Sequence, residues 1–320
     1  MTRWTSDDIP PLTGRRAVVT GATSGLGFQT ALELGRHGAD VILAVRDRTR
    51  GEASRKAMET ELAGVPGRGS FEVGDLDLAS LASVHAFAEG VAATGQDLHL
   101  LVNNAGIMAI PRRETVDGFE MQLGTNHLGH MALTLRLLPV LARTGAQGAA
   151  SRVVTVSSNA HKGGRIDLDD LMGARSYGPW STYSQSKLAN LLFAFELQRR
   201  VDAADLPIGS YAAHPGYSAT NLTSVGPAMT GSKVQKWGTR VADRLFAQSA
   251  TMGALPTLYA ATVPGLAPAS YVGPSGFNEL RGHPTLVTPR DTALDESVAG
   301  ALWTRSEELI GLRFDDVVAT

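Results

Sequence analysis

Short apolar runs alternate with longer Ala- and Leu-rich segments along most of the chain, and this alternation restricts the possible folds more than any other feature. The runs contain few polar residues, which predicts strands that are covered on both faces. Such strands, separated by helices, form a doubly wound parallel sheet with helices on both faces. The predicted strands are 16–20, 41–45, 70–73, 98–102, 152–156 and 208–213, and the predicted helices lie near 25–36, 50–63, 79–93, 115–143 and 182–203.

The chain of 320 residues is expected to form a single α/β domain over 1–320, because no linker separates two cores. The segment 222–275 breaks the alternation, since it is rich in Gly, Pro, Ser and Ala and carries one amphipathic stretch over 233–246. A late insertion of this kind often forms a lid over a site, and we expect a C-terminal substrate lid here. A surface excursion without a role at the site is the alternative. A last helix is predicted over 293–309, with Trp303 as a docking residue.

Composition excludes several classes of partner. The formal net charge is −2 and no basic stripe is present, so neither a nucleic-acid partner nor an anionic membrane is expected. The first fifteen residues lack an apolar signal core, and the longest apolar stretch, 131–142, is interrupted by Arg136 and Pro139. The chain has no Cys, which fits a reducing compartment. We therefore expect a cytoplasmic protein.

A glycine-rich loop directly follows the first predicted strand and opens the first predicted helix. Glycines at these points let the backbone turn tightly and approach a pyrophosphate, while the helix N-terminus presents free N–H groups. The order strand, loop, helix therefore predicts a Rossmann-type dinucleotide site. A loop that only packs the helix on the strand is the alternative. The residues expected to bind the cofactor here are Gly21, Thr23, Ser24, Gly25, Leu26 and Gly27.

The end of the second predicted strand bears on the choice of dinucleotide. NAD-binding proteins commonly place an acidic residue about 20 residues past the loop, on the ribose 2′-hydroxyl, whereas Val45 stands there in this chain. Arg46 follows, and a guanidinium suits a 2′-phosphate. These residues favour NADP(H) over NAD(H). Asp47 is the counter-argument, because a carboxylate pointing inward would favour NAD(H), and Arg46 could also be a solvated loop cation.

Tyr183 and Lys187 lie four positions apart, so a helix would place both side chains on one face. A free tyrosine has a pKa of about 10 and is a poor proton donor near neutrality. A fixed ammonium one turn away favours the phenolate, so we expect Lys187 to lower the pKa of Tyr183. Such a pair suits the acid/base half of carbonyl reduction or alcohol oxidation.

The loop, the sequence Asn-Asn-Ala-Gly at 103–106 and the Tyr183/Lys187 pair, in this order, resemble the short-chain dehydrogenase/reductase family over roughly residues 14–222. The sequence Tyr-Ser-Gln-Ser-Lys-Leu-Ala-Asn at 183–190 and His-Pro-Gly at 214–216 are similar to the retinol-dehydrogenase-like branch. So is Asn-Ala-His at 159–161, leading to Ile-Asp at 166–167.

The resemblance implies further site residues. The catalytic set would be Asn126, Ser158, Tyr183 and Lys187, with Ser157 as a competitor for the serine position. Cofactor contacts would come from Asp77 and Leu78 near the adenine, where Asp75 competes. Further along the cofactor they would come from Asn103, Ala105, Gly106, Tyr183, Lys187, Pro215, Gly216 and Thr220. The expected mechanism delivers hydride from the nicotinamide to a carbonyl carbon, with Tyr183 as proton donor and Ser158 as hydrogen-bond donor to the oxygen. Lys187 would hold the nicotinamide ribose, and Asn126 would hold a water that connects Lys187 to solvent.

The expected substrate is a lipophilic ketone, aldehyde or alcohol, because the candidate pocket residues are mostly apolar or aromatic. They are Met108, Ile110, His161, Trp180 and Tyr217, with parts of 222–250. A non-catalytic NADP(H)-binding regulator or scaffold is the alternative, and light-dependent tetrapyrrole reduction is disfavoured by the absence of Cys. His127 and His130 lack a third ligand, so no metal is expected. Family members commonly pair through the long helices, here 115–143 and 182–203, so a homodimer or homotetramer is possible, unless the C-terminal part covers that surface.

Overall fold

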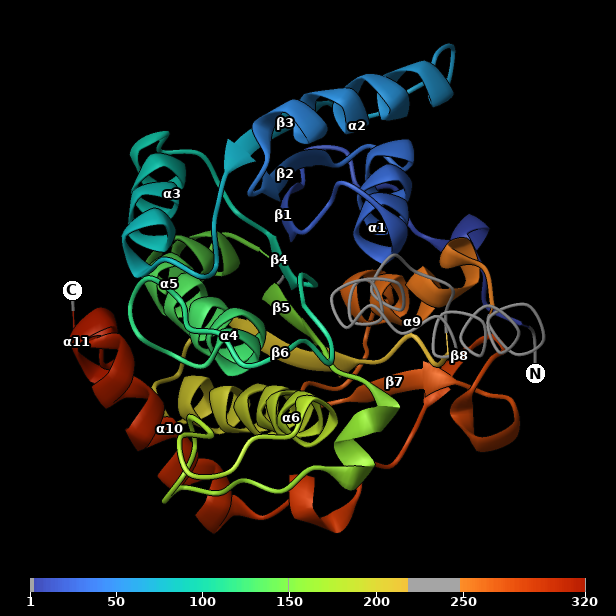
Figure 1. The fold of residues 1–320 in the computed structure, drawn as a ribbon. Helices are drawn as coiled ribbons and strands as arrows, with labels where there is room; N and C mark the ends of the chain where they lie inside the picture. Colours follow the sequence, from blue (N-terminus) through green and yellow to red (C-terminus); the bar gives the residue numbers. More distant parts are fainter. Residues whose placement is uncertain (1–2, 149, 218–247, 320) are drawn as a thin grey trace.

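A single twisted sheet forms the centre of the molecule (Figure 1). The computed structural model describes residues 3–148, 150–217 and 248–319. Within these residues the sheet has eight strands in the order β3-β2-β1-β4-β5-β6-β7-β8. Every neighbouring pair is parallel except β7 and β8, which are antiparallel. The strands are β1 (Arg16–Thr20), β2 (Asp40–Val45), β3 (Phe71–Asp75), β4 (Leu100–Asn103), β5 (Ser151–Val156), β6 (Ile208–Ala213), β7 (Tyr271–Pro274) and β8 (Pro284–Leu286).

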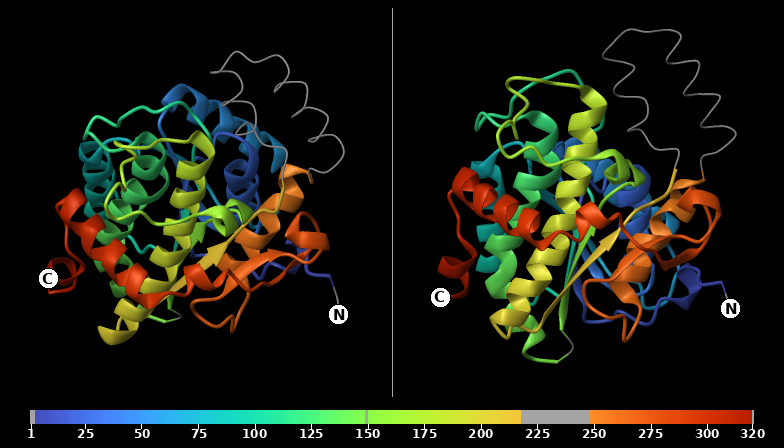
Figure 2. Two further views of the ribbon diagram at one scale, coloured as in Figure 1. Left: turned by 60° about the horizontal axis from the view of Figure 1, so that its bottom comes forward. Right: turned by 90° about the horizontal axis from the view of Figure 1, so that it is seen from below.

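Helices cover both faces of this sheet, which confirms the predicted doubly wound Rossmann fold (Figures 1 and 2). One face is covered by α1 (Gly25–Arg36), α2 (Arg48–Glu61) and α9 (Ala250–Thr262), and the other by α3 (Leu81–Ala93), α5 (Gly129–Gly145) and α6 (Pro179–Ala203). Short side chains define several helix starts, because Asp47, Ser80 and Asp295 accept hydrogen bonds from backbone N–H groups of the first turns. The shorter elements are η1 (Ser6–Asp8), α4 (Met121–Leu123), η2 (Gly124–Leu128), η3 (Asn159–Gly163), η4 (Phe277–Glu279) and η5 (Asp291–Ala293).

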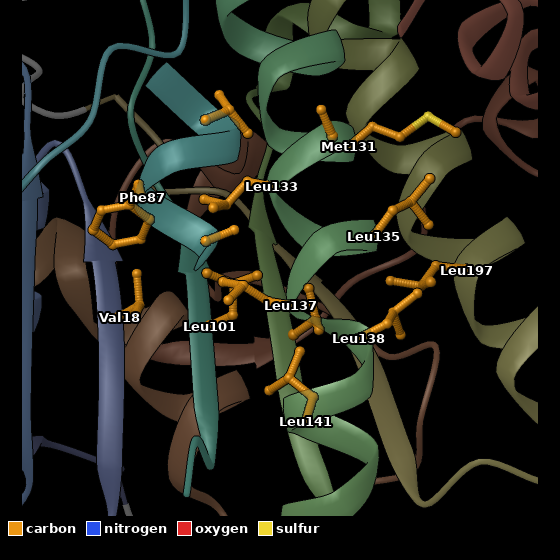
Figure 3. Close-up of a cluster of buried hydrophobic side chains, with 14 of the residues drawn as sticks. Val18, Phe87, Leu101, Met131, Leu133, Leu135, Leu137, Leu138, Leu141 and Leu197 are labelled. Carbon is orange, nitrogen blue, oxygen red and sulfur yellow. The ribbon is translucent and has the colours of Figure 1, made fainter. Parts of the chain in front are cut away.

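Two hydrophobic cores lie on opposite faces of the sheet. Val18 packs toward α3 and α5, whereas its neighbour Val19 packs toward α1 and α9, since successive strand residues point to opposite faces. Figure 3 shows the first core, where leucines of α5 such as Leu133 and Leu137 lie beside Val18 and Leu101 of the sheet. Full burial of each such side chain stabilises the fold by about 1.5–3 kcal/mol. These cores position the strand ends that carry the site.

The C-terminal helices α10 (Glu296–Ile310) and α11 (Phe314–Val318) pack on the outer sides of α6 and α5 (Figure 2). Trp303 is buried, its ring stacks on Phe193 at 5.7 Å between centroids, and Phe314 meets it edge-on. The predicted docking role of Trp303 is therefore confirmed. The two helices therefore cover part of the surface of the long helices α6 and α5.

Part of the predicted lid belongs to the core of the domain. Residues 250–262 form α9, which packs against α1 and against β5, β6 and β7, and residues 271–274 form a strand of the sheet. The lid prediction over 222–275 is thus wrong for its second half, because this Ala- and Leu-rich segment is needed to cover the sheet beyond β5. The remainder of the predicted lid, 222–247, lies outside the described residues.

Candidate active site

A cleft of about 310 Å³ opens at the carboxyl ends of β1 and β4. The strand order reverses between these two strands, so the chain leaves them toward helices on opposite faces. This is the position at which open α/β sheets bind their ligands. The cleft is lined by Gly21, Thr23, Ser24, Gly25, Leu26, Gly27, Ala44, Val45, Arg46, Asp47, Arg50, Leu76, Asp77, Leu78, Asn104, Ala105, Gly106, Ile107, Met108 and Thr125.

The glycine-rich loop has the geometry that a pyrophosphate requires. Gly21 and Gly25 adopt positive φ angles of 69° and 57°, which favour glycine. A Cβ on Gly27 would lie 2.4 Å from the carbonyl oxygen of Gly21 and 2.5 Å from Nδ2 of Asn104, so the helix could not approach the loop with a larger residue. The side chain of Ser24 makes no capping hydrogen bond to the first turn of α1. The N–H groups of that turn can therefore serve a bound anion.

The far end of the cleft presents two guanidinium groups, Arg46 and Arg50. The carboxylate of Asp47 lies beside them, but it accepts a hydrogen bond from the backbone N–H of Arg50 at 3.1 Å and so caps α2. Arg48 is paired with Asp75 at 2.8 Å. The end of β2 therefore presents two cationic side chains and one carboxylate to the cleft, and Arg50 was not among the residues predicted from the sequence.

Asp77, rather than its competitor Asp75, lines the cleft. One carboxylate oxygen of Asp77 accepts a hydrogen bond from the N–H of Ala79 at 3.0 Å, which fixes the turn that also brings Leu78 to the cleft. Asp75 points to the surface, where it pairs with Arg48. Asp77 and Leu78 therefore both line the cleft, and their contact with an adenine stays a prediction.

In the turn at 103–106, one residue supports the fold and the other three line the cleft. Asn103 is fully buried and donates a hydrogen bond to the Thr134 hydroxyl at 2.9 Å, so it fastens β4 to α5 and does not line the cleft as predicted. Its neighbour Asn104, which was not predicted as a contact, does line the cleft, and its amide donates to the carbonyl of Thr20 at 2.8 Å. Ala105 and Gly106 are lining residues, as expected.

A buried polar network connects this turn to Asn126. The ring of His130 contacts the carbonyl of Asn126 through Nδ1 at 3.0 Å, so Nδ1 carries the proton and Nε2 accepts from the Thr20 hydroxyl at 2.9 Å. That hydroxyl in turn accepts from the N–H groups of Asn104 and Ala105, both at 2.9 Å. Burial lowers the pKa of His130 to about 4, so the ring is neutral and acts as a structural link.

Asn126 lies in a π-helical turn, η2, between α4 and α5. Such turns are frequent at functional sites, because they displace one residue out of the regular helical pattern. The Asn126 side chain accepts from the N–H of Ile107 at 2.8 Å and donates to its carbonyl at 3.0 Å and to the Ser186 hydroxyl at 2.9 Å. It therefore joins the turn after β4 to α6. The predicted continuous helix over 115–143 is corrected to α4, η2 and α5.

Tyr183 and Lys187 both face inward from α6. The Lys187 ammonium donates to the carbonyl of Val156 at 3.1 Å and lies 5.9 Å from the centre of the Tyr183 ring. A Cβ on Gly106 would lie 3.5 Å from the same ammonium, which places the pair at the Gly106 end of the cleft. The structure thus brings the two residues together next to Gly106, although neither is among the lining residues of the cleft, and their contact with a cofactor stays a prediction.

The two competing serines at the end of β5 have different surroundings. The Ser157 hydroxyl is buried and donates to the carbonyl of Lys187 at 2.7 Å, which makes it a support for α6. The Ser158 side chain instead hydrogen-bonds to Tyr183 and accepts from the N–H of Ala160 at 3.2 Å. Geometry therefore favours Ser158 as the serine of the set.

Burial dominates the protonation of this pair. It raises the pKa of Tyr183 to about 12, although the hydrogen bond with Ser158 lowers it somewhat, and it lowers the pKa of Lys187 to about 8. The expectation of a lowered pKa for Tyr183 is thus wrong, because the loss of hydration on burial has the largest effect on this phenol. At pH 7 the phenol is protonated and the lysine is mostly charged.

The predicted pocket residues fall into two groups. Met108 lines the cleft, and Trp180 is 61% exposed with its ring packed edge-on against Tyr183 at 6.1 Å. His161 and Ile110 are buried, so neither forms an open pocket wall as expected. The His161 ring packs against Tyr271, and its Nδ1 donates to the carbonyl of Ser158 at 2.7 Å, which supports the serine from behind.

The turn at 214–216 is held from behind by η4. Gly216 has a φ of 64°, and a Cβ there would lie 2.4 Å from the Leu280 carbonyl oxygen. The N–H of Tyr217, which is half-buried, donates to the same oxygen at 2.8 Å. Pro215 and Gly216 are not among the lining residues of the cleft, and Thr220 lies outside the described residues.

The histidines of the described ranges do not form a metal site. No group of three or more His, Asp or Glu residues there could hold a metal ion. Burial lowers the pKa of His127 to about 3, and its Nε2 pairs with the Ser306 hydroxyl at 3.0 Å. None of the helices described in 3–148, 150–217 and 248–319 is both long and apolar enough to cross a membrane.

Comparison with known proteins identifies the family. A model of the short chain dehydrogenase family matches residues 15–229. Polyprenol dehydrogenase of Mus musculus is 43% identical over 307 residues, which cover 95% of this chain and 86% of that protein. Retinol dehydrogenase 14 of Homo sapiens is 40% identical over 310 residues, with 93% and 87% covered.

Solved structures agree with this assignment. The crystal structure of an uncharacterized protein from Mycobacterium paratuberculosis is 46% identical, with a TM-score of 0.79, and the match covers 98% of this chain and 99% of that one. A short chain dehydrogenase from Burkholderia cenocepacia in complex with NADP has a TM-score of 0.60 at 22% identity, over 82% and 96% of the two chains, and shows the shared fold. The chain therefore belongs to the short-chain dehydrogenase/reductase family and is an oxidoreductase of its retinol-dehydrogenase-like branch.

Proposed function

We propose that this enzyme interconverts a lipophilic ketone or aldehyde and its alcohol, with NADP(H) as the hydride carrier and Tyr183 as the proton donor or acceptor. The observation that carries the proposal is the arrangement of Tyr183, Ser158 and Lys187 at the Gly106 end of a cleft whose other end presents Arg46 and Arg50. A reacting oxygen at the hydroxyls and a dinucleotide along the cleft are compatible with this arrangement.

The residues present fit a dinucleotide with a 2′-phosphate. The glycine loop and the N-terminus of α1 would hold the pyrophosphate, because the Cβ-free surface at Gly21 and Gly27 and the free N–H groups suit an anion in close contact. Arg46 and Arg50 would hold the 2′-phosphate, since Asp47 is engaged in capping α2. When bound, the nicotinamide supplies or accepts the hydride.

The side chains near Gly106 would move the proton. With a pKa of about 12, Tyr183 carries its proton at neutral pH and can donate it to the oxygen of a carbonyl that is being reduced. The Ser158 hydroxyl would donate a hydrogen bond to the same oxygen, where negative charge develops. The Lys187 ammonium stabilises the phenolate that is left behind, and Asn126 fixes the backbone of Ile107 beside it.

The substrate class is inferred from the exposed walls. Met108 presents apolar surface in the cleft and Trp180 presents aromatic surface next to Tyr183, which suits a lipophilic molecule better than a sugar or an acid. The names of the similar proteins from mouse and human, polyprenol dehydrogenase and retinol dehydrogenase 14, both denote oxidation of a lipophilic alcohol. Specificity need not carry over, because it depends on the walls of each site.

A spectrophotometric panel tests the proposal. Purified protein is mixed with NADPH or NADH and a series of lipophilic ketones and aldehydes, and the loss of the reduced-cofactor absorbance is followed. We expect turnover with NADPH and little with NADH. Tight NADPH binding without turnover on the whole panel would instead favour the non-catalytic regulator, which the complete set Asn126, Ser158, Tyr183 and Lys187 disfavours.

A further inference from the structure

Gln122 is a buried glutamine that connects two segments on either side of the candidate active site. It lies in α4 and is fully buried. Its Oε1 accepts a hydrogen bond from the backbone N–H of Ala109 at 2.7 Å. Its Nε2 donates to the carbonyl of Pro179 at 3.1 Å and to the Tyr177 hydroxyl at 3.0 Å. Both amide donors and one acceptor lone pair of the side chain are thus directed at these two segments.

The two backbone groups that Gln122 holds belong to the peptide units next to the substrate walls. The N–H of Ala109 is part of the peptide bond that joins Met108 to Ala109, and the carbonyl of Pro179 is part of the bond that joins Pro179 to Trp180. Met108 lines the cleft, and Trp180 packs against Tyr183. One side chain therefore fixes the backbone beside both apolar walls.

The segment that carries Met108 needs such a fixed partner. Ala109 has a φ of 49°, in the left-handed region that residues with a Cβ adopt only at a cost. The Tyr177 hydroxyl donates to the carbonyl of the next residue, Ile110, at 2.8 Å, so the segment is held from both sides. Without the bond from Gln122, Ala109 would relax toward ordinary angles and Met108 would move with it.

Glu120 holds Gln122 itself in place. Its carboxylate accepts from the N–H of Leu123 at 2.7 Å and begins α4. Glu120 thus fixes the first turn of α4, from which the Gln122 side chain reaches both segments.

We propose that Gln122 is a positioning residue for substrate specificity, which sets the separation of the Met108 and Trp180 walls without touching substrate or cofactor. The inference rests on the proposed function, because it assigns these two side chains to the substrate. It requires that the affinity for substrate depends on Gln122 while the affinity for NADPH does not.

The test compares Gln122→Met with the wild-type enzyme, because methionine has a similar length and no strong hydrogen-bonding group. We expect the KM for the best ketone or aldehyde to rise about tenfold, the effect of about one lost hydrogen bond. The kcat should stay within about threefold and the NADPH dissociation constant within about twofold, since those properties depend on other residues. Gln198→Met is the matched control. Gln198 is also buried and bonds the N–H of Ser210 at 2.6 Å and Asp202 at 2.7 Å, far along α6, so its loss should leave KM unchanged.

Hydrogen–deuterium exchange gives a second readout that does not depend on turnover. In Gln122→Met we expect faster exchange over 105–112 and 173–181 and unchanged exchange over 16–27. If Gln122→Met does not fold, Tyr177→Phe removes the hydroxyl bond to Ile110 and should give a smaller change in the same directions. Unchanged KM and unchanged exchange, or a parallel loss of kcat and NADPH affinity, would overturn the inference. Wild-type protein without turnover on the panel would refute the proposed function, and exchange would then decide the role of Gln122 alone.

Discussion

Arg46 gives the sharpest test of the cofactor proposal. We expect Arg46→Ala to weaken NADPH selectively, because this guanidinium lines the cleft and the neighbouring carboxylate of Asp47 is engaged with the N–H of Arg50. A hydrogen bond to a charged group contributes about 1.5–3 kcal/mol. Arg46 is exposed, so we take the lower end, about 1.5 kcal/mol, which corresponds to about a tenfold loss in kcat/KM for NADPH. The kcat/KM for NADH should be nearly unchanged.

The assay is the ratio of kcat/KM with NADPH to that with NADH, measured on one carbonyl substrate. Arg48→Ala is the matched control, because Arg48 lies in the same turn but is paired with Asp75 at 2.8 Å and with Glu52 at 3.8 Å. We expect the ratio to fall about tenfold in Arg46→Ala and, if the effects add, about a hundredfold when Arg50→Ala is combined with it. An unchanged ratio in the double variant, or an equal fall in Arg48→Ala, would refute the assignment of the 2′-phosphate site.

Three further predictions concern the proton-transfer residues and their support. Tyr183→Phe should reduce turnover at least about a hundredfold, and fluorescence titration should show an unchanged NADPH dissociation constant. The rate of alcohol oxidation by the wild-type enzyme should rise with pH, because the phenol, with a pKa of about 12, must first lose its proton. Lys187→Met should inactivate the enzyme yet raise the free energy of unfolding at pH 7 by up to about 3 kcal/mol. The reason is that the pKa of Lys187 is about 8 in the folded protein against 10.5 in the free side chain, so the gain in stability of the variant should disappear as pH rises from 8 to above 10.5. Urea unfolding at pH 7 and at pH 10.5 measures this gain. A variant less stable than the wild type at pH 7 would contradict the prediction. Glu279→Gln should lower the free energy of unfolding by about 1–2 kcal/mol at pH 7, because hydrogen bonds with His214 and Lys162 hold the pKa of Glu279 at about 2. This contribution to stability is present above pH 4.5 and is lost as pH falls toward 2. Equal effects of the substitution at pH 7 and pH 3 in urea unfolding would argue against the prediction.

Much of the sheet and of the dinucleotide cleft could be predicted, because both follow from local patterns. The apolar runs at 16–20 and 208–213 became β1 and β6 with the predicted ends, and the glycine loop became the N-terminal turn of α1. The last part of the sheet could not be predicted in the same way. β7 and β8 are short, with four and three residues, and the pairing of β7 with β6 depends on contacts distant in sequence.

The direction of individual side chains could not be predicted from the sequence either. His161 follows Ser158 so closely that it looked like a pocket residue, but the 3-10 turn η3 sends its ring into the interior. The pKa of Tyr183 was mistaken for a related reason. Helical spacing shows that a cation is near, whereas the degree of burial, which here has the larger effect, depends on the packed structure. Gln122 was missed because a single glutamine carries no motif.

The C-terminal helices have a consequence for assembly. α10 and α11 lie against α6 and α5, and Trp303 fastens them by its stack on Phe193. A second copy that approached α5 or α6 from this side would meet α10 and α11 first. Association through the covered surfaces would therefore require the displacement of residues 296–318 and would expose the Trp303 indole to water. We therefore expect light scattering to report one subunit per particle, whereas particles of two or four would mean that association uses a different surface.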